Sequence, residues 1–226
     1  MSTLAASPHD TPAATAADEG PLTGDAWPAA LLGLCPLLPA CRDATASLAL
    51  GAALAVVTTI ATLMLAVLPQ RGLGGNPRTW AALLVFAAAA TAAQRVIEAW
   101  WPALAPTAML FVPLIAAHGA LLRQAVASHA SVYAQMRRGL RWGFGLGALL
   151  LALGAARELL GRGTLFADAG ALLGTPFLAW QPFADARGLR LATLAPGAFL
   201  ALALLLAAKQ ARDLRAAARP SATEVA

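Results

Sequence analysis

The chain has 226 residues, of which 59% are hydrophobic and only 12% are charged, and its formal net charge is +5. Soluble domains carry about 25% charged residues, so this composition excludes an ordinary soluble protein and predicts an integral membrane protein. No nucleic-acid-binding motif accompanies the positive charge. We therefore expect the lipid bilayer, and no nucleic acid, as a partner.

The chain begins with a polar stretch, residues 1–26, that contains no Lys or Arg. It lacks the basic start and the apolar run of a signal peptide. We therefore expect a disordered cytoplasmic tail there, followed by a membrane domain over residues 27–212 and a flexible C-terminal tail over residues 213–226.

Six apolar segments follow one another along the chain. The clearest covers residues 48–68 and has 21 uncharged residues, enough to cross a hydrocarbon core of about 30 Å at 1.5 Å per residue. The six segments are residues 26–40, 48–68, 79–93, 99–122, 142–156 and 191–208. They predict an all-α, multi-pass membrane protein with six transmembrane segments.

Segments one and four each contain three prolines. Proline interrupts a helix, and backbone groups freed inside a membrane must be satisfied within the protein or around a cavity. We therefore expect both segments to be broken helices near the working centre. The resemblance of "CPLL" at 35–38 to "VPLI" at 112–115 further suggests two inverted three-helix halves.

Positive charges favour one side of this topology. Lys and Arg gather after segments two, four and six, which by the positive-inside rule places both termini in the cytoplasm. The residues concerned are Arg71, Arg78, Arg123, Arg137, Arg138, Arg141, Lys209, Arg212, Arg215 and Arg219.

Chemistry-bearing residues are few. Cys35 and Cys41 are the only cysteines, and a disulfide between them would close a very short loop. A cysteine here is either a small buried apolar residue or a metal ligand. Arg95 and Glu98 are three residues apart on a predicted helix and can pair; we favour a pair at the membrane interface over a proton or sodium relay.

Four stretches carry a family resemblance. They are "LGLCPLL" (32–38), "FVPLIAAHG" (111–119), "RELLGRGTLF" (157–166) and "LAPGAF" (194–199). Together they resemble the Rnf/Nqr family of membrane subunits, in particular the E-type members found in Rnf electron transport complexes. The resemblance implies a six-helix protein of the bacterial inner membrane. With a homologous sister subunit, it would frame an iron-sulfur cluster in a complex that couples electron transfer to ion transport.

The resemblance also assigns residues. Cys35 falls on the family's first cysteine, which implies that it is an iron ligand. The family's second cysteine is replaced by Gly119, which cannot ligate. His118 and Cys41 are candidate replacements, because His can take the place of Cys on iron; otherwise the cluster is incomplete or absent.

Arg157 and Glu158 match the family's "RE" pair before the "GTLF" turn. They are adjacent, about 100° apart around a helix, so we do not expect them to pair with each other. For these two residues we favour closing a helix end or docking a partner over a place on an ion path.

Two interpretations of the function remain. The first is a membrane subunit that relays electrons through a shared iron-sulfur cluster in an ion translocase, and the second is a cofactor-free structural subunit, which Gly119 favours. No flavin-attachment element or dinucleotide fingerprint occurs, so we expect neither flavin nor nucleotide on this chain. Enzyme activity is expected only of the assembled complex. A stand-alone transporter is a third interpretation, but no charged residues at the breaks support it.

Overall fold

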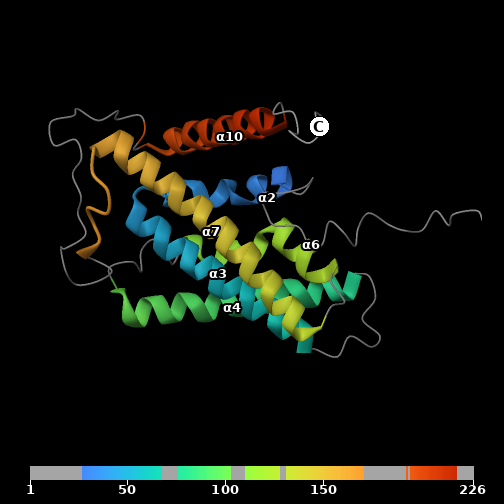
Figure 1. Cartoon of the computed structure of the whole chain (residues 1–226). Coiled ribbons are helices and arrows are strands. Elements are labelled where there is room, and N and C mark those ends of the chain that lie inside the picture. Colours follow the sequence, from blue (N-terminus) through green and yellow to red (C-terminus); the bar gives the residue numbers. More distant parts are fainter. Residues whose placement is uncertain are drawn as a thin grey trace, which may run out of the picture. The chain divides into compact units, whose positions relative to one another are not determined.

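The computed structural model describes residues 27–67, 76–102, 110–127, 131–170, 192 and 194–217. Across these ranges the chain forms helices and no extended β-strand, so the all-α prediction holds for them (Figure 1). The elements, where η marks a 3-10 helix, are α2 (Trp27–Leu34), η2 (Cys35–Ala40), α3 (Ala44–Val67), α4 (Asn76–Trp100), η4 (Pro113–Ala117), α6 (Gly119–Ala127), α7 (Val132–Arg162) and α10 (Ala195–Ala217).

Three helices of the described part are long and apolar enough to cross a membrane: α3, α4 from Pro77 onward, and α7. They coincide with predicted segments two, three and five. Helix α10 covers most of segment six but is not among the three. The multi-pass character is thus supported, while the full set of six spans, its orientation and the inverted halves stay predictions. The proposed tails, 1–26 and most of 213–226, lie outside the described residues.

Segments one and four both contain 3-10 helix. Helix α2 ends at Leu34 and the chain continues as η2, with Pro39 inside it. In segment four, η4 begins at Pro113 and α6 begins at Gly119, while residues 103–109 lie outside the described ranges. Proline cannot donate a backbone hydrogen bond, which accounts for regular α-helix being lost at these places.

The chain divides into two compact units. The first comprises Met1–Leu37 and Ala49–Leu149, and the second Leu38–Leu48 and Leu150–Ala226. In the first unit, α4 packs against η4 and α6, and α6 also packs against α2. This arrangement brings α2, the first part of segment one, into the same unit as the described part of segment four.

Helices α3 and α7 approach each other closely within the first unit because small residues face one another. A Cβ added to Gly147 would lie 2.9 Å from the backbone oxygen of Gly51, and a Cβ added to Gly143 would lie 2.6 Å from the Cα of Ala55. Small residues that admit close backbone contact are typical of helix pairs in membranes. Thr58 lies beside Gly143 in this helix contact. Its hydroxyl is satisfied within α3, because it donates a hydrogen bond of 2.7 Å to the Leu54 carbonyl one turn earlier.

We predict that Gly147→Val destabilises the protein, because the added side chain cannot fit beside the Gly51 backbone. Overpacking of this kind costs about 1–3 kcal/mol, so the midpoint of heat-induced aggregation in detergent should fall by several degrees. Gly119→Ala is the matched control, since a Cβ at Gly119 meets no atom within 4 Å. Equal midpoints for the two variants would contradict the close packing of α3 and α7.

Candidate functional site

Cys35 lies at the junction where α2 gives way to η2. Its thiol is free and half-buried, and it makes a weak hydrogen bond of 3.9 Å to the Leu31 carbonyl, one turn earlier in the chain. Because this thiol is partly accessible and only weakly hydrogen-bonded, it can react with a reagent or bind a metal. The sequence-predicted ligand therefore stands at an irregular point of the backbone.

Cys41 has a different environment. It is fully buried and lies in the second unit, between η2 and α3. Burial raises the pKa of its thiol to about 11, and a hydrogen bond with Ser47 offsets this only in part. Because metal ligands are thiolates, this environment argues against Cys41 as the replacement ligand.

His118 connects η4 to α6 and is buried, with 1% of its surface exposed. Its backbone N–H donates to the Ile115 carbonyl at 3.2 Å, and its carbonyl accepts from the Leu122 N–H at 3.1 Å. Its ring Nδ1 accepts a hydrogen bond of 3.4 Å from the Leu121 N–H. The side chain thus satisfies one of the free N–H groups that begin α6, as an N-cap residue does.

The second ring nitrogen of His118 has no hydrogen-bond partner among the described residues, although it is buried. Because Nδ1 accepts, the neutral ring carries its proton on Nε2. The Ala30 backbone approaches the imidazole but forms no hydrogen bond of ordinary geometry with Nε2. A buried donor left without a partner at this place calls for a chemical explanation.

The imidazole of His118 packs directly against Gly33. A Cβ added to Gly33 would lie 2.6 Å from Cε1, 2.7 Å from Nε2 and 2.8 Å from Nδ1. Gly33 precedes Cys35 by two residues in the chain. The structure therefore places the predicted replacement ligand against the backbone that leads into the predicted first ligand. No sequence pattern signals this contact.

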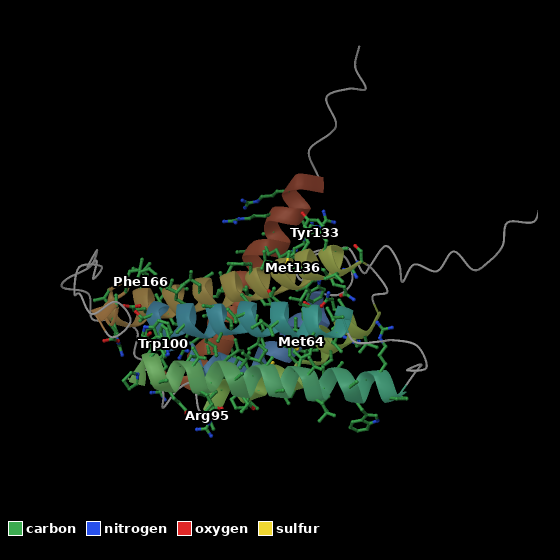
Figure 2. All side chains as sticks on the ribbon, turned by 90° about the horizontal axis from the view of Figure 1, so that it is seen from below. Met64, Arg95, Trp100, Tyr133, Met136 and Phe166 are labelled. Atoms are coloured by element: carbon green, nitrogen blue, oxygen red, sulfur yellow. The ribbon has the colours of Figure 1, made fainter. Side chains whose placement is uncertain are left out.

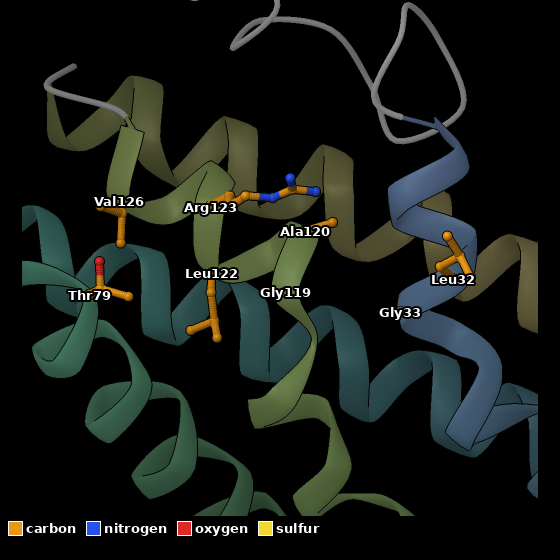
Figure 3. A pocket seen from close by; sticks show the side chains of 8 residues that line it. All are labelled: Leu32, Gly33, Thr79, Gly119, Ala120, Leu122, Arg123 and Val126. Atoms are coloured by element: carbon orange, nitrogen blue, oxygen red, sulfur yellow. The ribbon is translucent and has the colours of Figure 1, made fainter. Parts of the chain in front are cut away.

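Gly119 faces open space. A Cβ there would meet no atom within 4 Å, and the residue lines an apolar groove of about 740 Å³ together with Gly33 (Figure 3). A cysteine would therefore fit where this chain has glycine. In the part of the chain that the structure describes, no three His, Cys, Asp or Glu residues come close enough to hold a metal ion.

Arg157, in the second unit, is buried and binds backbone carbonyls. Its guanidinium donates to the carbonyls of Ala192 and Leu194 at 3.0 Å each and to that of Leu38 at 3.3 Å. It also donates to the carbonyl of Cys41. One side chain thus satisfies acceptors from two segments that are more than 150 residues apart in sequence, a task suited to the fork of donors in arginine.

Glu158 binds different backbone groups. Its Oε2 accepts from the N–H of Ala44, the first residue of α3, at 2.8 Å. Its Oε1 accepts from the Ala167 N–H at 2.8 Å and from the Thr164 hydroxyl at 3.2 Å. A carboxylate at a helix N-terminus is also favoured by the helix dipole. Glu158 thus serves the N-terminal end of α3, whereas Arg157 serves carbonyls at the end of η2 and in the segment before α10.

Arg95 and Glu98 form the ion pair that their spacing predicts. Arg95 Nη1 lies 3.0 Å from Glu98 Oε2, and Gln94 donates to Glu98 at 2.8 Å. The Arg95 side chain is 73% exposed and points away from α4 (Figure 2). Trp80 and Trp100 are exposed and lie twenty residues apart on the same helix, which corresponds to about 30 Å along its axis. Tryptophans are typical of the two membrane interfaces, and the Arg95–Glu98 ion pair lies near the interface that Trp100 would mark.

The comparisons with known proteins agree on one family. Residues 22–206 match the family model described as "Rnf-Nqr subunit, membrane protein". A relative from Pseudomonas aeruginosa (strain UCBPP-PA14) is 38% identical over 188 residues, which is 81% of this chain and 78% of the relative. Relatives from Shewanella amazonensis and Rhodobacter capsulatus are 38% and 36% identical, over 87% and 82% of this chain and 86% and 77% of their own lengths. Each of the three is named as the E component of an ion-translocating oxidoreductase complex.

We predict that Arg157→Leu strongly destabilises the protein, because three buried carbonyls and one partly buried carbonyl lose a charged donor. Each unsatisfied buried group costs about 1–3 kcal/mol, so the purified variant should unfold at clearly lower temperature and accumulate less in membranes. Arg157→Lys should rescue only in part, since lysine lacks the planar fork. Arg162→Leu is the control, because its ion pair with Asp168 is solvent-exposed and such pairs contribute at most about 1 kcal/mol.

The two thiols should differ in reactivity. In detergent at pH 8, N-ethylmaleimide should label Cys35 well before Cys41, as measured by mass spectrometry on the variants Cys41→Ser and Cys35→Ser. A pKa of about 11 leaves little Cys41 thiolate at pH 8, and its labelling rate should rise about tenfold for each pH unit until the pKa is passed. Faster labelling of Cys41 than of Cys35 would refute the assigned environments.

Proposed function

We propose, on the premise that this chain belongs to the Rnf-Nqr family of membrane subunits, that it acts as the E-type subunit of an ion-translocating oxidoreductase complex. The support is a family match over residues 22–206 and relatives of that name that align over more than three quarters of both chains. The three apolar helices fit a multi-pass membrane subunit. The chain would work only in the assembled complex, beside a homologous sister subunit, and we place it in the bacterial inner membrane with both termini in the cytoplasm.

Within that role, we propose that Cys35 donates its thiolate to an iron-sulfur cluster shared with the sister subunit. The single observation that carries this is the free, half-buried thiol at the junction of α2 and η2. When bound, such a cluster supplies a one-electron carrier whose potential depends on its ligands and their hydrogen bonds. The task of this chain's own residues is to present the thiol on a fixed backbone, and the packing of His118 against Gly33 serves that task.

A second iron ligand from this chain would come from His118 or Cys41. His118 is favoured over Cys41, because its Nε2 is buried without a partner in the described structure and its ring already contacts the segment that leads to Cys35. The thiol of Cys41 is held protonated by burial, which raises its pKa to about 11.

The alternative is a cofactor-free structural subunit of the same kind of complex. The observation in its favour is Gly119, which leaves the second cysteine position without a side chain that could ligate. In this alternative His118 is only the cap of α6. The two functions differ in whether the assembled complex holds iron through this chain.

The deciding experiment measures iron, acid-labile sulfide and the reduced-state EPR spectrum of the complex purified through this subunit. We expect iron and sulfide in the native complex, loss of both in Cys35→Ala and retention in Cys41→Ala. A native complex that contains the partner subunits but no iron bound through this chain would reject the cluster and leave the structural function. Loss of iron in both cysteine variants, with the partner subunits still bound, would assign the second ligand to Cys41 instead of His118.

A second experiment restores the missing cysteine. Gly119→Cys should fold, since the new side chain enters open space, and should lower the reduction potential of the cluster, because replacing His by Cys on iron lowers it. Gly170→Cys, at an equally open position of the second unit, is the control and should leave the potential unchanged. An unchanged potential in Gly119→Cys would show that position 119 does not face the cluster.

A further inference from the structure

The C-terminal end of α10 extends beyond the part of the helix that packs. Helix α10 buries Ala198, Ala201 and Leu202 within the second unit. Over residues 207–215, by contrast, every side chain whose environment the structure describes is exposed, except that of Lys209, which is half-buried. The residues of the last three turns thus bury almost nothing against the rest of the described chain.

This end also lies past the apolar part of the helix. The uncharged stretch ends at Ala208, and α10 continues as one unbroken helix to Ala217 (Figure 1). At 1.5 Å per residue, Leu214 lies about 9 Å beyond Ala208 along the helix axis. Because no break turns the chain back, these residues project away from the apolar part of α10. In the predicted topology they project into the cytoplasm.

The projecting end combines two arginines with an exposed leucine. Ala211, Arg212, Leu214 and Arg215 share one side of the helix, because they are separated by one, three or four residues; we call these four residues the α10 end face. Leu214 is 63% exposed. No hydrogen bond or ion pair is found for Arg212 or Arg215 within the described ranges. Like charges three residues apart on a helix repel each other, so this face favours an acidic partner.

The exposed leucine distinguishes a protein partner from a lipid headgroup. A phosphate group would satisfy the two arginines, but it would not bury Leu214, which lies beyond the apolar part of α10. Short helical ends gain most of their stability in proteins from packing an apolar face. A protein surface can bury the leucine and pair the arginines at the same time.

We propose that the α10 end face docks a water-exposed subunit of the complex, through an acidic surface with an apolar depression for Leu214. Carboxylates accept two parallel hydrogen bonds from a guanidinium group, and an apolar centre with a polar rim is the usual composition of protein interfaces. This inference rests on the proposed function, because it requires the assembled complex. It concerns the second unit alone and involves neither Cys35 nor His118.

The first test places the photoreactive residue p-benzoylphenylalanine at Leu214 of the full chain and irradiates native membranes before the complex is purified. Mass spectrometry should find the adduct on a co-purifying subunit, in a peptide rich in Asp and Glu. The matched control is the same group at Leu204, which is 64% exposed but lies in the apolar part of α10, and it should not give this adduct. Adducts to lipid alone at Leu214 would overturn the proposal and assign the end face to the membrane surface.

The second test removes the charge. Arg212→Gln combined with Arg215→Gln should weaken binding of that subunit about tenfold, equivalent to about 1.4 kcal/mol, when the subunit is titrated back onto complex stripped by salt. Arg212→Lys combined with Arg215→Lys should retain most of the affinity. Arg42→Gln removes an exposed arginine elsewhere in the second unit and should change nothing.

The outcomes separate this inference from the proposed function. Unchanged affinity in the double glutamine variant would overturn the docking proposal. A complete complex in which Leu214 gives no adduct to another subunit would do the same, while leaving the proposed function intact. A native chain that purifies without any other subunit would instead reject the proposed function, and the docking proposal with it.

Discussion

The buried guanidinium of Arg157 binds four backbone carbonyls, and the second unit depends on this interaction. Two of the carbonyls, of Leu38 and Cys41, come from the segment after the first helix break, and two come from the segment before α10. In a medium without water, such groups must be satisfied by the protein itself. Glu158, the next residue, serves the N–H groups at the start of α3 and in the turn that follows α7. Two adjacent ionisable residues thus hold irregular backbone in place.

In the first unit, the imidazole of His118 likewise satisfies a backbone group where regular helix is interrupted. It accepts a hydrogen bond from the start of α6 and fills the space left by Gly33 on α2. Both the candidate ligand position and the groove follow from this one packing arrangement. The groove exists because the residues around the capped helix start are small, and Gly119 opens into it for the same reason.

The sequence predicted the helical class, the three long apolar helices and the Arg95–Glu98 pair, because each depends on local composition or on spacing along one helix. Its motifs also identified the family, which the comparisons confirm. The sequence could not predict what Arg157 binds, since its acceptors are backbone atoms brought together by tertiary folding. Nor could it predict that His118 lies against Gly33, because neither residue type specifies a partner 85 positions away. The six-span topology and the iron ligands stay predictions.

The capping role of His118 bears on the position of Gly119, where the family resemblance leads us to expect a cysteine. If the cluster were the only support of the helix break at residues 118–119, losing that ligand would leave the start of α6 unsatisfied. Here the Leu121 N–H is satisfied by the His118 ring, and the Leu122 N–H by the backbone carbonyl of the same residue. The backbone around Gly119 is therefore supported without a metal. A chain with glycine at position 119 can thus keep the break between η4 and α6 whether or not it holds iron.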